Sequence, residues 1–212
     1  MQLKFKKLDD RPFIVIEGNI GVGKTSLARA LSEKWGYSLV LEEFEENEFL
    51  SDFYKPEVSV SFQTEVRFIV DRFNQLREAL DENQPVITDY FIEKSLIFSE
   101  NSLSAREFNL FRDLYSILFD KIRKPDLYVY LSADVARLRS NIRKRNRGME
   151  QEISESYLEQ INNRYLKYVS AHKELNSLLL DVTKYDFLTY PEHLTEIASL
   201  IQSKLLAIQQ VR

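Results

Sequence analysis

The chain has 212 residues, 44% of them hydrophobic and 29% charged, with a formal net charge of −4. This composition predicts one ordinary globular domain over residues 1–212, and the acidic balance argues against a binder of duplex nucleic acid. The absence of cysteine excludes disulfides, zinc–thiolate sites and thiol catalysis.

The ten residues at the N-terminus are rich in charge and lack the apolar core of a signal peptide. No apolar run approaches the ~20 residues that span a bilayer. Together with the missing cysteines, these features favour a cytoplasmic protein with no membrane partner.

Short apolar runs alternate with longer segments of helical character. Each run is nearly continuous in its apolar residues, as is typical of parallel strands covered on both faces. The runs lie at residues 13–16, 37–41, 85–88, 127–131 and 178–182. Strands that alternate with helices predict an α/β fold with a five-stranded parallel sheet.

Two of the predicted helices carry an apolar stripe. In both, apolar residues recur at steps of three and four, which places them on one helix face. The stripes comprise residues 62, 66, 69, 73, 76 and 80 in one helix and 111, 114, 118 and 122 in the other. Either stripe packs on the domain's own core or part of it forms a subunit interface. A further amphipathic helix is predicted over residues 192–210, with Pro191 in its first turn.

The segment Gly18-Asn19-Ile20-Gly21-Val22-Gly23-Lys24-Thr25 matches the phosphate-loop motif G-x-x-x-x-G-K-[ST] in full. A predicted strand precedes it and a predicted helix, residues 25–34, follows, as the motif requires. Backbone N–H groups of this loop and of Ser26 would hold the phosphates of ATP. Lys24 would bridge the β- and γ-phosphates, and Thr25 would bind Mg²⁺ through its hydroxyl. A phosphate loop alone leaves GTPase, ATPase and kinase open.

Two carboxylates follow predicted strands directly. Glu42 ends the second strand and Asp89 ends the third, and ligands of open α/β sheets bind at this edge. One carboxylate could take a proton from an acceptor hydroxyl while the other holds Mg²⁺. The plainer alternative is that such acids cap the following helix. Asp181, after the last strand, is more typical of a structural residue.

Residues 137–147 hold five arginines and a lysine, which is unusual in an acidic protein. Arg143, Arg145 and Arg147 cannot share one helix face, so a partly irregular segment is predicted. Arginine suits bidentate contact with phosphate, and a mobile basic lid over ATP would supply charge and exclude water. The alternatives are a solvated basic face or an RNA-binding patch.

With these motifs assembled, the sequence resembles the deoxynucleoside kinase family, and its bacterial purine deoxynucleoside kinases most of all. The resemblance covers nearly the whole chain and is carried by residues 16–25, 41–44, 49–54, 61–64, 145–159 and 186–187. It implies a P-loop kinase with an arginine-rich lid that uses ATP and Mg²⁺. It also implies a homodimer in which the two long helices pair across a two-fold axis.

The resemblance assigns roles in nucleoside binding. It implies that Glu42 is the general base for the 5′-hydroxyl, that Tyr54 meets the 3′-hydroxyl and that Gln63 pairs with the base. An amide such as Gln63 offers both donors and acceptors to a base edge, and Phe98 could stack on that base. The same resemblance implies that Asp89 lies beside this substrate and can hold Mg²⁺.

The resemblance also assigns roles around ATP. It implies that Arg145 and Arg147 meet phosphates, Arg145 as a catalytic residue with Glu42 and Lys24. Glu150 would meet the 3′-hydroxyl of the nucleoside. The pair formed by residues 186–187, Asp186 and Phe187, would lie near the adenine of ATP.

Two departures from the family pattern stand out. The family often has an arginine directly after the acid of the third strand, where this chain has Tyr90, and Asn141 stands where one lid arginine is expected. Lys94, Arg143 or Lys144 could compensate. The Asp89-Tyr90 pair resembles a bacterial subgroup that acts on purines, so deoxyadenosine or deoxyguanosine is the expected acceptor.

Two other functions compete with this interpretation. A nucleoside monophosphate kinase would need basic residues for the acceptor's phosphate near the third strand, and residues 86–95 offer only Lys94. A P-loop regulatory or RNA-binding protein could use the basic residues 137–147 instead, and the salt dependence of RNA binding would reveal it.

Overall fold

The computed structural model describes residues 11–43, 47–49, 60–82, 84–151 and 153–211. Its sheet has five strands in the order β2-β3-β1-β4-β5, and every neighbouring pair is parallel. The strands are β1 Phe13–Gly18, β2 Ser38–Val40, β3 Val86–Thr88, β4 Leu127–Ser132 and β5 Ser177–Asp181. This confirms the predicted α/β fold and its parallel sheet.

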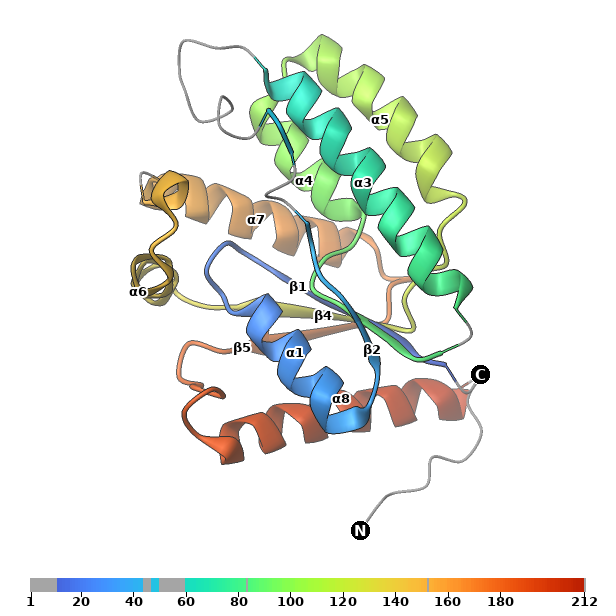
Figure 1. Cartoon of the computed structure of the whole chain (residues 1–212), viewed down its shortest axis with the longest axis vertical. Coiled ribbons are helices and arrows are strands. Elements are labelled where there is room, and N and C mark those ends of the chain that lie inside the picture. Colours follow the sequence, from blue (N-terminus) through green and yellow to red (C-terminus); the bar gives the residue numbers. More distant parts are fainter. Residues whose placement is uncertain (1–10, 44–46, 50–59, 83, 152, 212) are drawn as a thin grey trace.

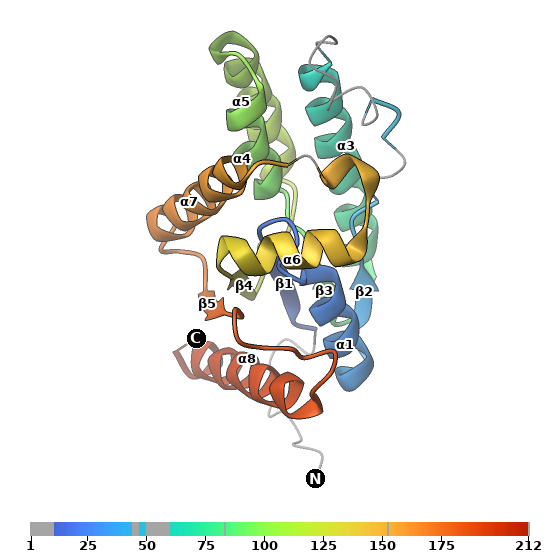
Figure 2. The ribbon, with the colours of Figure 1, turned by 90° about the vertical axis from the view of Figure 1, so that its left-hand side faces the viewer.

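Helices cover both faces of this sheet (Figures 1 and 2). Helices α1 and α8 lie on one face, and α3, α4, α5 and α7 on the other. Their bounds are α1 Lys24–Trp35, α3 Ser61–Asp81, α4 Glu93–Ser102, α5 Ala105–Phe119, α6 Val135–Arg145, α7 Glu155–Ala171 and α8 Pro191–Val211, with a 3-10 turn η1 at Gly148–Glu150. The described helices include none that is long and apolar enough to cross a membrane.

Two apolar cores lie on the two faces of the sheet. Successive residues of a strand point to opposite faces, so Ile14 and Ile16 of β1 belong to the core under α1 and α8. Phe13 and Val15 belong to the core under α3, α4, α5 and α7. All four side chains are fully buried, which explains why the strand sequences are continuously apolar rather than alternating.

The apolar stripes of the two long helices face the second core. Ile69, Phe73 and Leu76 of α3 and Phe111 of α5 are buried there. The predicted extent of the second helix was wrong, because α5 ends at Phe119 and Ile122 follows in a turn. Ile122 is nevertheless buried in the same core, so it continued the apolar pattern without continuing the helix.

The basic segment, residues 137–147, is more regular than predicted. Its first nine residues lie within α6, whose N-cap Asp134 accepts a hydrogen bond from Arg137 N. The helix ends at Asn146, which adopts a left-handed conformation with φ of 53°. Asparagine tolerates this backbone well, so only Asn146 and Arg147 lie in the irregular part that the arginine spacing suggested.

Candidate active site

The phosphate loop connects β1 to α1 at the carboxyl edge of the sheet, and its glycines are fixed by close contacts. A Cβ atom on Gly18 would lie 2.4 Å from the carbonyl oxygen of Leu131. Gly21 has φ of 79°, and a Cβ atom there would lie 2.8 Å from the carbonyl oxygen of Leu138. Any side chain at either position would displace neighbouring backbone, so this loop conformation requires glycine.

Lys24 points back into the loop. Its Nζ donates hydrogen bonds to the carbonyl oxygens of Gly18, at 2.9 Å, and Asn19, at 3.0 Å. Burial lowers the pKa of Lys24 to about 8, and repulsion from Lys94 acts in the same direction. The lysine therefore lies at the place where an incoming phosphate would exchange with the carbonyl groups as its partner.

A cavity of about 510 Å³ opens beside the phosphate loop. It is lined by loop and first-turn residues, by the basic segment and by the chain after β5: residues 21–26, 137, 141, 144, 145, 147, 182 and 185–189. Most of the predicted ATP-binding residues therefore meet around one space. The remaining three, Gly18, Asn19 and Ile20, form the strand side of the loop, where Asn19 Nδ2 donates to Leu158 O at 2.7 Å.

The two strand-end acids converge on the phosphate loop, as predicted. Thr25 Oγ1 donates to Asp89 Oδ2 at 2.5 Å, and the other oxygen of Asp89 accepts from the backbone N of Glu42 at 2.8 Å. A threonine hydroxyl and a carboxylate oxygen are ligands that suit Mg²⁺, which completes its shell with waters and phosphate oxygens. Thr25 and Asp89 therefore fit the metal role that the motif predicts.

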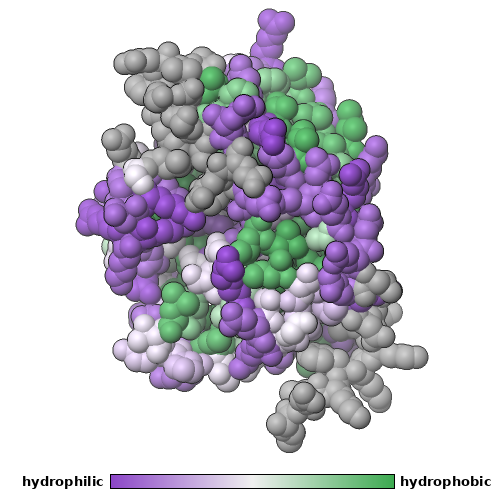
Figure 3. Space-filling view, in the orientation of Figure 1, coloured by the Kyte–Doolittle hydropathy of each residue, from purple (hydrophilic) through white to green (hydrophobic). Residues whose placement is uncertain are grey.

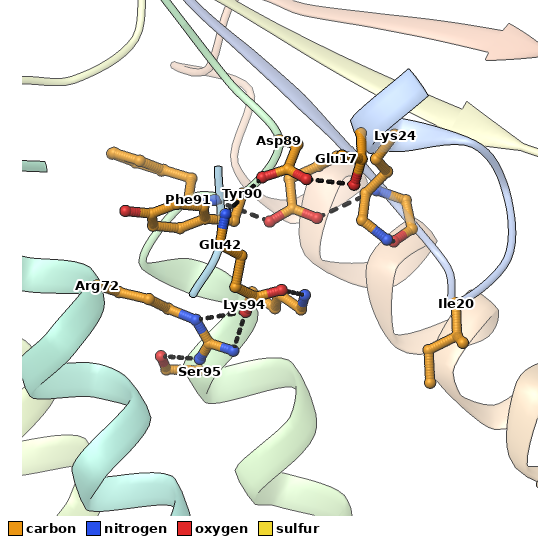
Figure 4. A network of polar contacts seen from close by, with 12 residues as sticks. Glu17, Ile20, Lys24, Glu42, Arg72, Asp89, Tyr90, Phe91, Lys94 and Ser95 are labelled. Carbon is orange, nitrogen blue, oxygen red and sulfur yellow. Dashed lines mark hydrogen bonds and ion pairs between the residues drawn. The ribbon is translucent and has the colours of Figure 1, made fainter. Parts of the chain in front are cut away.

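Glu42 is held by two cations (Figure 4). One carboxylate oxygen accepts from Nε of Arg72 at 2.9 Å and from its Nη2 at 2.5 Å, and the other accepts from Lys94 Nζ. Arg72 Nη1 also donates to Ser95 Oγ at 2.7 Å. Burial alone would raise the pKa of Glu42, but Lys94 and Arg72 hold it well below its usual range. Glu42 is therefore a fixed anion.

A second glutamate, Glu17, ties the phosphate loop to the segment after β3 and to α7. Its carboxylate accepts hydrogen bonds from Gly18 N, Phe91 N and Tyr165 Oη, at 3.1, 2.9 and 2.9 Å. Burial raises the pKa of Glu17, although Lys94 and Lys24 oppose this. Its role is positional, because all three partners are part of the protein framework around the loop; Figure 4 shows Glu17 beside Phe91.

The predicted lid residues also meet. Arg145 Nη2 forms an ion pair with Glu150 Oε2, and Arg147 Nη1 lies 3.7 Å from Glu150 Oε1. Both arginines line the cavity beside the phosphate loop. Glu150 thus holds two cations at the cavity rim, where they can exchange partners with phosphate oxygens.

The predicted nucleoside-binding residues are placed unequally. Tyr54 lies outside the described residues. Phe98 is half-buried on α4, edge-on to the ring of Tyr165 with 6.4 Å between centroids, and Lys94 Nζ lies 5.6 Å from its centroid. Gln63 is exposed in the first turn of α3. Phe98 is thus near the Glu42 cluster, whereas Gln63 has no described hydrogen bond that ties it there.

Comparison with known proteins agrees with this arrangement. The family model for deoxynucleoside kinase matches residues 14–207. The chain belongs to the deoxynucleoside kinase family. A deoxyguanosine kinase of Bacillus subtilis (strain 168) is 36% identical over 207 residues, which cover 94% of this chain and all of that protein. A deoxyadenosine kinase of Lactobacillus acidophilus is 28% identical over 92% of this chain and 97% of its own length.

Solved structures of the family share the fold. A deoxyadenosine kinase from M. mycoides superposes with a TM-score of 0.78 at 25% identity, over 90% of this chain and 99% of that chain. The protein is therefore an ATP-dependent deoxynucleoside kinase, a transferase of nucleotide salvage.

The two departures from the family pattern have structural explanations. Tyr90 is buried in the second core and donates through its hydroxyl to Gln75 Oε1 at 2.7 Å. Arg72 and Lys94 supply the positive charge beside Glu42 instead. Asn141 Nδ2 donates to Gly21 O at 2.8 Å and so braces the phosphate loop. Lys144 lines the ATP cavity.

Sequence reasoning missed two charged residues of α3 in this region. Arg72 contacts Glu42. Glu65, which is buried about two helical turns before Arg72, accepts a hydrogen bond from Ser102 Oγ at 2.9 Å. The signal was present in the apolar stripe itself. Positions 65, 69, 72 and 76 follow one helix face, and two of the four are charged. Charged residues inside an apolar stripe indicate a buried polar site.

Proposed function

We propose that this kinase transfers the γ-phosphate of ATP to the 5′-hydroxyl of a purine deoxynucleoside, deoxyguanosine or deoxyadenosine. The observation that carries the proposal is Glu42, a fixed carboxylate whose backbone N is bonded to Asp89 beside Thr25 of the phosphate loop. Support for a purine acceptor comes from the relatives, which include deoxyguanosine and deoxyadenosine kinases.

Glu42 acts as the general base in this proposal. Phosphoryl transfer passes through a loose transition state in which the protein mainly positions the reactants and stabilises charge. A carboxylate with a low pKa is a weak base, so Glu42 chiefly orients the 5′-hydroxyl and takes its proton late, when the oxygen has become acidic. Lys94 can then turn from Glu42 towards the phosphate, since it already lies close enough to repel Lys24.

The remaining charges act on ATP. Lys24 takes the β- and γ-phosphates and Arg145 the transferred phosphoryl group, with Arg147 on neighbouring oxygens. Asp186 and Phe187 border the adenine. Mg²⁺, held by Thr25 and Asp89, would neutralise charge between the β- and γ-phosphates.

The proposal assigns the sugar and base contacts to the residues that the family resemblance implies. Glu150, released from the arginines, accepts from the 3′-hydroxyl together with Tyr54, and Phe98 stacks on the base. Gln63 stays a prediction as a base contact. ATP and the deoxynucleoside suffice as partners, with no nucleic acid or membrane, and a cytoplasmic location stays an expectation from the cysteine-free composition.

A homodimer is part of the proposal. Leu110 and Ile117 of α5 are 60% and 62% exposed, and Val70 of α3 is 38% exposed. They lie on α3 and α5, and apolar surface gathers over these helices in the upper part of Figure 3. Leu110, Leu114 and Ile117 follow helical spacing, so a two-fold pairing of α5 would bury them.

Sedimentation of the wild type and of Ile117→Glu tests this: a dimer that the substitution splits supports it, and a 25 kDa wild-type species contradicts it.

A substrate panel tests the reaction itself. Purified enzyme with Mg-ATP is offered each of the four deoxynucleosides and, separately, their 5′-monophosphates. We expect monophosphate products from deoxyguanosine or deoxyadenosine. Background turnover with every deoxynucleoside, while ATP still binds, would refute the proposal, and turnover of the monophosphates alone would identify a nucleoside monophosphate kinase.

A further inference from the structure

Glu65 is a buried carboxylate with unused hydrogen-bonding capacity. It is 3% exposed, on the inner face of α3. Its Oε1 accepts from Ser102 Oγ at 2.9 Å, the one hydrogen bond that the described residues give its carboxylate. A carboxylate can accept about four hydrogen bonds, so Glu65 keeps acceptor capacity for a ligand that reaches it.

The position of Glu65 relative to Glu42 suits a nucleoside. On α4, Lys94, Phe98 and Ser102 follow one ridge at steps of four. Lys94 contacts Glu42 at one end of this ridge, Ser102 contacts Glu65 at the other, and the ring of Phe98 lies between them. Eight residues of helix span about 12 Å, which is comparable to a nucleoside measured from its 5′-oxygen to the far edge of its base.

Helix α3 has a similar spacing, seven residues instead of eight. Glu65 and Arg72 are seven residues apart, so they share one face, and Arg72 contacts Glu42. Gln63 precedes Glu65 by two residues, which turns its side chain by about 200° around the helix, and it is exposed. The face of α3 that holds Glu42 therefore presents Glu65 at the base end, and Gln63 points to the other side.

We infer that Glu65 reads the base of the acceptor and selects guanine over adenine, an inference that rests on the proposed deoxynucleoside kinase activity. A carboxylate only accepts hydrogen bonds. The Watson–Crick edge of guanine offers two adjacent donors, N1–H and the N2 amino group, whereas adenine offers one donor and one acceptor. Adenine would leave a carboxylate oxygen facing its N1 lone pair, and a site of this kind discriminates strongly.

The charge state of Glu65 supplies a second signature. Burial raises its pKa to about 7, although Arg72 of α3, the Ser102 hydroxyl and Lys94 of α4 oppose the rise and Glu42 adds to it. Above pH 7 the carboxylate accepts from guanine. Below pH 7 the protonated acid carries a donor and fits adenine better, so preference for guanine should weaken as the pH falls.

The test is Glu65→Gln, which keeps the shape and introduces a donor. At pH 8, kcat/KM is measured for deoxyguanosine and deoxyadenosine, and we expect their ratio to shift towards adenine by 10- to 100-fold, about what one bidentate pair discriminates. Glu78→Gln makes the same charge change at an exposed position of α3 and should leave the ratio unchanged. Gln63→Ala tests the alternative that Gln63 reads the base. If the ratio of the two kcat/KM values changes in Gln63→Ala and not in Glu65→Gln, the inference is overturned.

Three further readings keep the outcome clear. Thermal unfolding and ATP binding check that Glu65→Gln is folded. If the variant turns over neither nucleoside, calorimetric binding of deoxyguanosine and deoxyadenosine gives the same ratio, and an unchanged ratio again overturns the inference. A wild type that phosphorylates no deoxynucleoside would instead refute the proposed function itself, and a wild-type ratio that is flat from pH 6 to 8 would count against Glu65 alone.

Discussion

Glu93 and Lys94 are neighbours at the start of α4, yet they belong to opposite kinds of environment. Lys94 points into the active site and pairs with Glu42, whose other oxygen is bonded to Arg72. Glu93 is fully buried, and neither of its oxygens has a hydrogen-bond partner within the described chain. Burial raises its pKa to about 8, near the phenol of Tyr168.

The region around Glu93 has a cavity of its own. It measures about 610 Å³ between α4, α5 and α7, and Tyr115 and Tyr168 are among the residues that line it. Glu93 is fully buried and Glu42 only partly, with 13% of its side chain exposed. Two cations bond directly to Glu42 and keep it ionised, whereas Lys124 lowers the pKa of Glu93 too little to offset its burial. The proposed reacting centre at Glu42 therefore differs from the region around Glu93 in its paired charges next to the phosphate loop.

The largest expected effect separates the two glutamates by activity. Glu42→Gln removes the acceptor of the 5′-hydroxyl proton, and we expect kcat to fall about a thousandfold, within the range of general-base contributions. Nucleoside binding should survive, since the amide still accepts a hydrogen bond. Steady-state kinetics and calorimetry measure both quantities. Glu93→Gln is the matched control and should keep kcat within a few-fold; equal losses in both variants would mean that Glu42 is merely structural.

The next effect concerns stability. Arg72→Met leaves Glu42 buried with one cation instead of two, and breaking a buried pair typically costs about 3 to 5 kcal/mol. Urea denaturation should show this loss, and adding Glu42→Gln should recover much of it, because the uncompensated charge is then gone. Additive effects of the two substitutions would show that Arg72 stabilises the fold through its contacts with Ser95 and not through Glu42.

The sequence predicted what local patterns determine. Apolar continuity located all five strands to within two residues, and the phosphate loop identified Lys24 and Thr25 without any tertiary information. It failed at the end of α5, where Ile122 is apolar because it fills the core from a turn. Hydrophobic period reports burial and only indirectly the backbone conformation.

Sequence reasoning named the candidate-site residues that belong to one motif. It missed those that the packing of helices brings together. Arg72 lies thirty residues from Glu42, and their contact depends on how α3 packs against β2 and α4. Likewise, Asn141 and Tyr90 stand where the family pattern has arginines. In the structure Asn141 donates a hydrogen bond to Gly21, and Tyr90 packs in the core. Charge can be relocated between elements while the family's chemistry is retained, which a linear comparison of motifs does not reveal.

The pH dependence of stability should have opposite signs at the two glutamates. Glu93 has a folded pKa of about 8, above the ordinary value of about 4.3, so the folded state binds more protons between these values. Its cost therefore grows as the pH rises from about 4 to about 8 and then levels off. Glu42 has a lowered pKa, so its contribution is present above about pH 4 and is lost in acid.

Unfolding of the Glu93→Gln variant tests the expected pH dependence at Glu93. The free energy of unfolding of the variant, minus that of the wild type, should increase by a few kcal/mol between pH 5 and pH 8. The same difference for Glu78→Gln, an exposed position, should stay flat. A flat difference for Glu93→Gln would show that the carboxyl is solvated or paired in solution.

The smallest expected effect is the pH dependence of ATP binding through Lys24, the cation of the phosphate loop. Lys24 is half-buried and has a pKa of about 8, and only its protonated form attracts phosphate. Above pH 8 the dissociation constant of ATP should therefore rise, by at most tenfold per pH unit, while the phosphates themselves, with a second pKa near 6, no longer change charge. Calorimetry without nucleoside at pH 7 to 9.5 measures this. Lys24→Arg cannot lose its proton in that range, so its affinity, even if weaker, should be independent of pH; a parallel slope in both proteins would place the titration elsewhere, with Lys94 as the next residue to substitute.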